Sequence, residues 1–169
     1  MTEKIKEKYL IGIDVGSTTT KIAVVDEKTR KMLYSDYQRH HADQLRSVYR
    51  ALARLEPDYF KKKLRIVLTG SGAKRISEAL DVPFIQEVVA NSLALRDRYQ
   101  CVRTAIELGG QDAKMIFFRQ DEKTGALTVA DMRMNGSCAG GTGAFIDEVA
   151  SILRVPIEEF NDMASRGSC

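Results

Sequence analysis

One arrangement occurs twice along this chain: two apolar runs are joined by a short turn that combines glycine with side-chain oxygens. The first turn reads DVGSTT over residues 14–19, and the second reads ELGGQD over residues 107–112. After each turn the chain continues with a third apolar run and then with segments of helical spacing. The repeat therefore predicts an α/β fold with two lobes of one plan, residues 1–100 and 101–169.

Hydrophobic periodicity gives the expected elements of each lobe. Strands are predicted over residues 9–15, 21–26, 31–38, 64–69, 102–108, 113–119 and 126–134, with a further short strand at 82–85. Helices are predicted over residues 42–55, from the glycines at 70 and 72 to about residue 80, over 87–99 and over 144–153, and another begins near Pro156. The first three strands are expected to form a meander, and the pattern starts again at residue 102.

Both turns have the chemistry of a phosphate-binding loop. Glycine in a tight turn lets successive N–H groups approach an anion, and three hydroxyl side chains follow the first glycine: Ser17, Thr18 and Thr19. Asp14 ends a buried strand, where a carboxylate is costly without a partner, and a hydrated Mg²⁺ between phosphates would supply one. Glu107 and Asp112 offer the same chemistry in the second turn. Either turn alone is more often a plain hairpin, but the matched pair favours a nucleotide held from both sides.

Composition and charge indicate which partners and which cellular compartment to expect. The formal net charge is +3 and the basic residues are scattered, so we expect no nucleic-acid partner. No export signal and no membrane-spanning apolar stretch are seen, and the three cysteines are an odd number. We therefore expect a cytoplasmic protein with reduced thiols. Cys101 is expected to be a small buried side chain, and the adjacent His40 and His41 are expected to form a surface connection.

Three motifs together resemble a known family. IGIDVGSTTTK at 11–21 and IELGGQDAK at 106–114 resemble the two phosphate loops of the actin, sugar kinase and heat-shock chaperone ATPase superfamily. With MNGSCAGGTGAF at 134–145, they resemble the BadF/BadG/BcrA/BcrD-type ATPases, which activate 2-hydroxyacyl-CoA dehydratases and benzoyl-CoA reductases. The resemblance implies a ribonuclease H-like, actin/chaperone-type ATPase fold, with a complete first lobe and the first part of the second.

The resemblance also implies an activity and its cofactors. Family members are homodimers that share one 4Fe-4S cluster and use Mg²⁺ and ATP, released as ADP, to drive a low-potential electron into an acyl-CoA dehydratase or reductase. Reduced ferredoxin or flavodoxin is the implied electron donor. Cys138 matches the first cluster cysteine, and a thiolate that opens a helix among small residues is accessible to a cluster.

The site residues follow from the same resemblance. The implied catalytic residues, which position Mg²⁺, water and the γ-phosphate, are Asp14, Glu107, Gln111 and Asp112. The implied nucleotide-binding residues are Gly16, Ser17, Thr18, Thr19, Lys21, Gly109, Gly110, Gln111, Gly141, Thr142 and Gly143.

The sequence departs from the family pattern in two respects. Glu107 stands where the family usually has Asp, which lengthens that side chain by one methylene. The family's second cluster cysteine, its adenosine-binding Gly-Gly motif and its returning C-terminal helix have no match, and Cys169 is a fallback cluster ligand. We therefore expect an N-terminal part of a longer protein, which alone binds nucleotide weakly and does not turn it over.

Two other functions stay open at this point. A small-molecule kinase of the same superfamily would use a carboxylate to deprotonate a substrate hydroxyl and would need no cysteine at position 138. A non-catalytic nucleotide-binding or assembly module would keep the fold without turnover.

Overall fold

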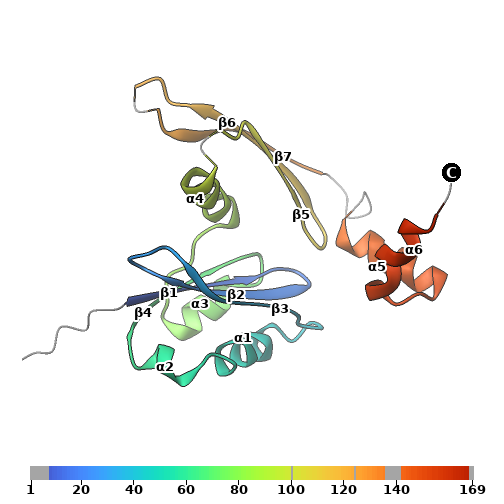
Figure 1. Cartoon of the computed structure of the whole chain (residues 1–169), viewed down its shortest axis with the longest axis horizontal. Coiled ribbons are helices and arrows are strands. Elements are labelled where there is room, and N and C mark those ends of the chain that lie inside the picture. Colours follow the sequence, from blue (N-terminus) through green and yellow to red (C-terminus); the bar gives the residue numbers. More distant parts are fainter. Residues whose placement is uncertain (1–7, 100, 124, 136–141, 168–169) are drawn as a thin grey trace, which may run out of the picture. The chain divides into compact units, whose positions relative to one another are not determined.

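The computed structural model of the chain describes residues 8–99, 101–123, 125–135 and 142–167 (Figure 1). The chain divides into two compact units, Met1–Asp97 and Arg98–Cys169. No helix among the described residues is long and apolar enough to cross a membrane.

The first unit is built on a four-stranded sheet. Its strands are β1 (Lys8–Val15), β2 (Thr19–Asp26), β3 (Met32–Arg39) and β4 (Lys63–Thr69). They lie in the order β3-β2-β1-β4, with β1 antiparallel to β2 and parallel to β4. The predicted meander of the first three strands is confirmed. Because β1 is central, its alternate residues Ile11, Ile13 and Val15 are at most 1% exposed and form the centre of the core.

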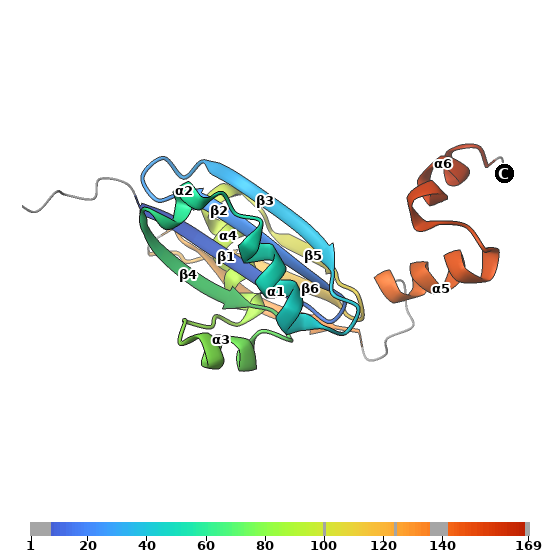
Figure 2. The same ribbon diagram turned by 90° about the horizontal axis from the view of Figure 1, so that it is seen from below.

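Helices line both faces of this sheet. The helix α1 (Gln44–Ala53) and the short α2 (Pro57–Phe60) lie across one face, as Figures 1 and 2 show. Asp43 accepts a hydrogen bond from the Arg46 amide and so caps α1, which packs Val48 and Ala51 into the core. Leu45 has the helical spacing of these residues but is 61% exposed. On the other face, α4 (Glu87–Arg98) and the sheet line a cavity.

The second unit repeats the meander. Its strands β5 (Thr104–Leu108), β6 (Ala113–Gln120) and β7 (Leu127–Met134) pair antiparallel in chain order. Ile116, Phe118 and Leu127 are the buried hydrophobic residues of these strands. The helix α5 (Gly143–Leu153) follows, then a 3₁₀ turn η1 (Ile157–Glu159) after Pro156, and α6 (Phe160–Ser165).

Three expectations differ from the structure, and one short helix was not expected. The segment at 82–85 forms a single bridge, between Phe84 and Leu68, because the chain turns into α4 directly afterwards. The short α2 was not expected, although Pro57 stands at its first turn. Cys101 is exposed, since it precedes β5 in a turn and does not lie in the strand. His40 is buried rather than part of a surface connection, whereas His41 is exposed.

The exit from β4 passes close to the end of β1. Gly70 has φ +97°, and a Cβ atom there would lie 2.4 Å from both Asp14 Oδ1 and the Val15 carbonyl oxygen. The Gly72 amide then donates a 2.8 Å hydrogen bond to that Val15 oxygen. From this loop the chain enters α3 (Lys74–Leu80). Glycine is therefore required at position 70 both for its backbone conformation and for the space around it.

We expect Gly70→Ala to lower the free energy of unfolding by about 3 kcal/mol, because it adds a disfavoured φ and a backbone clash. Urea unfolding followed by circular dichroism measures this loss. Gly12→Ala is the matched control, since a Cβ there meets nothing within 4 Å; it should change stability by no more than about 0.5 kcal/mol. Equal effects of the two substitutions would contradict this account.

Candidate functional site

The first candidate phosphate turn is a closed two-residue hairpin. Val15 pairs with Thr20 across the strands, and the Gly16 amide donates a 2.9 Å hydrogen bond to the Thr19 carbonyl oxygen. Ser17 and Thr18 therefore form the tip, with partly exposed side chains, while Thr19 is 7% exposed. The hydroxyls and amides at the tip can reach an anion, and Thr19 acts through its carbonyl to close the turn.

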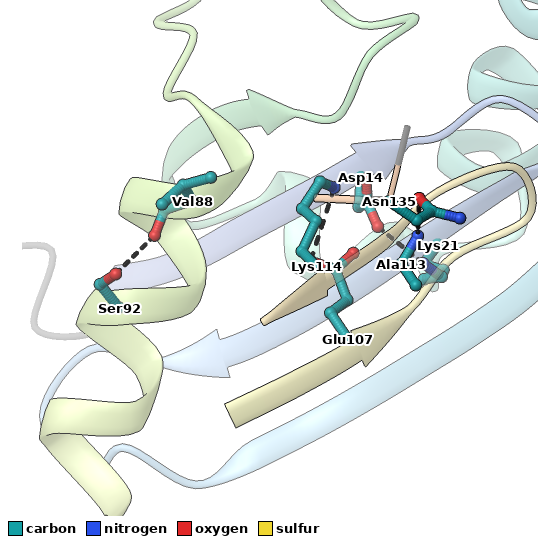
Figure 3. Close-up of polar contacts among 8 residues, drawn as sticks. All are labelled: Asp14, Lys21, Val88, Ser92, Glu107, Ala113, Lys114 and Asn135. Atoms are coloured by element: carbon teal, nitrogen blue, oxygen red, sulfur yellow. Dashed lines mark hydrogen bonds and ion pairs between the residues drawn. The ribbon is translucent and has the colours of Figure 1, made fainter. Parts of the chain in front are cut away.

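An ion pair lies directly below this turn. Asp14 and Lys21 are cross-strand partners, and Lys21 Nζ donates a 2.8 Å hydrogen bond to Asp14 Oδ2 (Figure 3). Partial burial by itself lowers the pKa of Lys21. The hydrogen bond to Asp14 and the negative charge of Asp14 raise it by a larger amount, so the pKa of Lys21 lies above its ordinary value. Lys21 therefore stays charged at neutral pH and holds one of the two Asp14 carboxylate oxygens.

The second hairpin repeats these contacts at the same spacing. The Gly109 amide donates to the Asp112 carbonyl oxygen at 2.8 Å, as Gly16 does to Thr19. Glu107 and Lys114 are cross-strand partners seven residues apart, as Asp14 and Lys21 are, and Glu107 Oε2 lies 3.5 Å from Lys114 Nζ (Figure 3). Both hairpins thus place an acid two residues before the closing glycine and a lysine opposite that acid.

The tip of the second turn is formed by Gly110 and Gln111. Gln111 and Asp112 are exposed, so their side chains are accessible to a ligand. A Cβ at Gly109 would lie 2.9 Å from the Asp112 carbonyl oxygen, which makes glycine necessary there. Behind the turn, Asn135 anchors β6: its Oδ1 accepts from the Ala113 amide at 2.9 Å (Figure 3), and its own amide donates to the Ala113 oxygen.

The second turn is also joined to the start of α5. The Gly143 amide donates to the Gly109 oxygen at 3.0 Å, and the Ala144 amide donates to the Gly110 oxygen at 2.8 Å. Two of the N–H groups that a helix leaves unpaired at its start are thereby used. Thr142, which precedes the helix, is fully buried. Gly143 therefore contacts the turn, and the contact of Thr142 and Gly143 with nucleotide stays a prediction.

His40 is a residue of this region that sequence reasoning missed. It is 6% exposed, and its backbone amide donates to the Thr18 oxygen at 3.2 Å. The Ala42 amide donates to His40 Nδ1, so the proton of the neutral ring lies on Nε2, which donates to the Gly16 oxygen at 3.1 Å. The only sequence signal is its position two residues after the strand predicted over 31–38. His40 thus fixes the first turn from below.

The donor set at Asp14 suits a hydrated cation rather than a fully liganded one. No group of three or more His, Cys, Asp or Glu residues able to hold a metal occurs among the described residues. Asp14 Oδ1 is buried and has no hydrogen-bond partner within the described part of the chain. A single unpaired carboxylate oxygen fits Mg²⁺, which keeps several waters and takes few carboxylates. Cys138, Gly141 and Cys169 lie outside the described residues.

Comparisons with known proteins agree with the motifs. A sequence profile of the BadF/BadG/BcrA/BcrD ATPase family matches residues 11–168. An activator of lactoyl-CoA dehydratase from Anaerotignum propionicum is 31% identical over 158 residues, covering 92% of this chain and 58% of the relative.

Solved structures agree on the fold. Component A of (R)-2-hydroxyglutaryl-CoA dehydratase from Acidaminococcus fermentans matches with a TM-score of 0.77 at 23% identity, over 95% of this chain and 60% of that one. The activator of 2-hydroxyisocaproyl-CoA dehydratase from Clostridium difficile, solved with bound ADPNP, matches with a TM-score of 0.73 at 25% identity, over 95% and 58%. The expected actin-like ATPase fold is confirmed. The chain spans 58–60% of the length of these three proteins.

We expect His40→Ala to lower the free energy of unfolding by about 2 kcal/mol, because it removes two side-chain hydrogen bonds and leaves the Gly16 oxygen unpaired. Thermal unfolding compared with the wild type measures the loss. His41→Asn serves as the control: His41 is exposed with φ 48°, a conformation that asparagine tolerates. If both variants unfold like the wild type, His40 does not fix the turn.

Proposed function

Since the chain belongs to the BadF/BadG/BcrA/BcrD ATPase family, we propose that it forms the phosphate-binding part of an ATP-hydrolysing iron–sulfur activator. In this proposal, ATP hydrolysis drives a low-potential electron into a 2-hydroxyacyl-CoA dehydratase or a benzoyl-CoA reductase-like partner. The names of the relatives, which include activators of lactoyl-CoA and 2-hydroxyisocaproyl-CoA dehydratases, support a partner of this class.

The repeated hairpin is the observation that carries the nucleotide part of the proposal. Each unit has one tight turn closed by a glycine amide, one acid two residues before that glycine, and one lysine opposite the acid. Plain hairpins need none of these polar groups in matching positions. Phosphates, however, require both N–H donors and balanced charge, which both turns offer.

The residues then have distinct tasks. Ser17 and Thr18, at the tip of the first turn, donate hydrogen bonds to phosphate oxygens, and the second turn does so through Gly110 and Gln111. Lys21 holds Asp14 Oδ2 and so orients Oδ1 toward the waters of a bound cation. Mg²⁺, when bound with ATP, neutralises charge that develops on the phosphates. Gln111 or Asp112 orients the attacking water; both are exposed.

The link between the second turn and α5 gives the proposal a route from nucleotide to cluster. The turn carbonyls of Gly109 and Gly110 bind the first amides of α5. Cys138, which precedes this helix in sequence, is the proposed first ligand of a cluster that two copies share in a homodimer, and Cys169 is the fallback for the second ligand from each copy. Reduced ferredoxin or flavodoxin is the proposed electron donor, in a cytoplasm that keeps the thiols reduced.

Nucleotide binding tests the first part. With Mg²⁺ and ADP at tenfold excess over the dissociation constant, the wild-type chain should gain about 1.4 kcal/mol of stability, seen as a higher unfolding temperature. Asp14→Asn should lose most of this gain. Asp36→Asn is the matched control, since Asp36 has the same 23% exposure and a 2.8 Å ion pair, to Arg54, from the opposite face of the sheet. The absence of any gain in the wild type would contradict the nucleotide role and favour the assembly module.

Iron binding tests the second part. After anaerobic reconstitution with iron and sulfide, we expect about four irons per two chains, lost in Cys138→Ser. Cys101→Ser, which changes an exposed cysteine of the same unit, should keep its iron. Nucleotide binding without specific iron, together with phosphoryl transfer to a small hydroxyl compound, would instead favour the kinase.

A further inference from the structure

Thr69 lies beside Asp14 at the end of the first-unit sheet. The two residues are register partners in the parallel pairing of β1 with β4, so their side chains lie on the same face. On its other side Asp14 pairs with Lys21, which holds Oδ2. Asp14, Lys21 and Thr69 line the same cavity, whose volume is about 750 Å³.

Two polar atoms of these residues lack a hydrogen-bond partner in the described part of the chain. Asp14 Oδ1 and Thr69 Oγ1 are both buried, and neither has a hydrogen-bond partner among the residues that the structure describes. More than about 90% of buried polar groups in proteins are paired, because an unpaired one costs free energy. Two unpaired atoms on neighbouring residues of one cavity therefore indicate a partner that the chain itself does not supply.

The surrounding backbone explains why the chain does not satisfy these atoms itself. Gly70 turns away from β4 with φ +97°, and its Cα region lies against Asp14 Oδ1. The amide of Gly72 is already used by the Val15 oxygen. The loop after Thr69 is thus held close to the carboxylate without donating to it.

We propose that Thr69 is a ligand-binding residue whose hydroxyl, together with Asp14 Oδ1, accepts the two hydrogen bonds of a water molecule bound to the nucleotide's Mg²⁺. This inference rests on the proposed nucleotide function. A metal-bound water uses its oxygen for the cation and has two O–H groups left to donate. Asp14 Oδ1 and Thr69 Oγ1 are two neighbouring acceptors, and the Lys21 contact fixes which carboxylate oxygen serves.

The proposal separates stability from binding. Thr69→Val keeps the shape of the side chain but removes a hydroxyl that has no partner in the free chain. The free variant should therefore unfold at the wild-type temperature or above it. A residue that served only to support the fold would give the opposite result.

Equilibrium binding of ADP with Mg²⁺ and with EDTA tests the inference. Thr69→Val should raise the dissociation constant of ADP about tenfold when Mg²⁺ is present, and should leave it unchanged in EDTA. Thr69→Ser should restore wild-type binding. Thr20→Val is the matched control: Thr20 Oγ1 is also unpaired among the described residues, but Thr20 is 1% exposed and is not one of the residues that line the cavity, so binding should not change.

The outcomes are distinguishable. If the wild type binds ADP more tightly with Mg²⁺ and Thr69→Val does the same, the role of Thr69 is wrong while the nucleotide function stands. Equal weakening with Mg²⁺ and with EDTA, or a lower unfolding temperature of the free variant, also overturns the role of Thr69. If the wild type binds no ADP under either condition, the proposed function fails and this inference fails with it.

Discussion

The parallel pairing of β1 with β4 is the constraint on which the geometry of the first unit depends. It covers the second edge of β1, whose residues Ile11, Ile13 and Val15 are at most 1% exposed. The same register aligns Asp14 with Thr69 and brings the glycine after β4 against the Asp14 carboxylate. A slip of one residue would turn every side chain of β4 to the other face and would separate the acid from the hydroxyl. The packing of the core and the alignment of Asp14 with Thr69 therefore both depend on the register of β1 with β4.

The two hairpins are similar in plan but differ in how tightly each is built. Lys21 is 47% exposed and lies 2.8 Å from a short acid, whereas Lys114 is 10% exposed and lies 3.5 Å from a longer one. A Cβ atom added at Gly16 would lie 3.6 Å from the nearest atom, whereas one added at Gly109 would lie only 2.9 Å from its nearest atom. The first turn instead has a side-chain hydrogen bond from His40 Nε2 to the Gly16 oxygen. Each unit therefore supports its turn by different contacts, although the hydrogen bond that closes each turn is the same.

Local pattern sufficed for the strands, the main helices and the two turns, because periodicity and glycine placement are properties of short segments. Local pattern could not predict contacts between segments that are far apart in the sequence. His40 is buried because the connection after β3 folds back onto the Gly16 turn, and nothing near residue 40 encodes that return. Thr69 ends a predicted strand, but only the register with β1 reveals its neighbour. Leu45 has the spacing of a core residue, yet the packed stripe of α1 runs through Val48 and Ala51. In each case tertiary placement decided what composition and spacing left open.

The hydrogen bonds between the second turn and α5 have a mechanical consequence. The helix is held at its first residues by two carbonyls of a loop whose own closure is only four residues wide. Its 11 residues extend over about 16 Å at the usual rise per residue. A tilt of about 10° at the loop would therefore carry the far end through about 3 Å. A change in the direction of the second turn would therefore displace Leu153 more than it displaces the glycines that hold the helix.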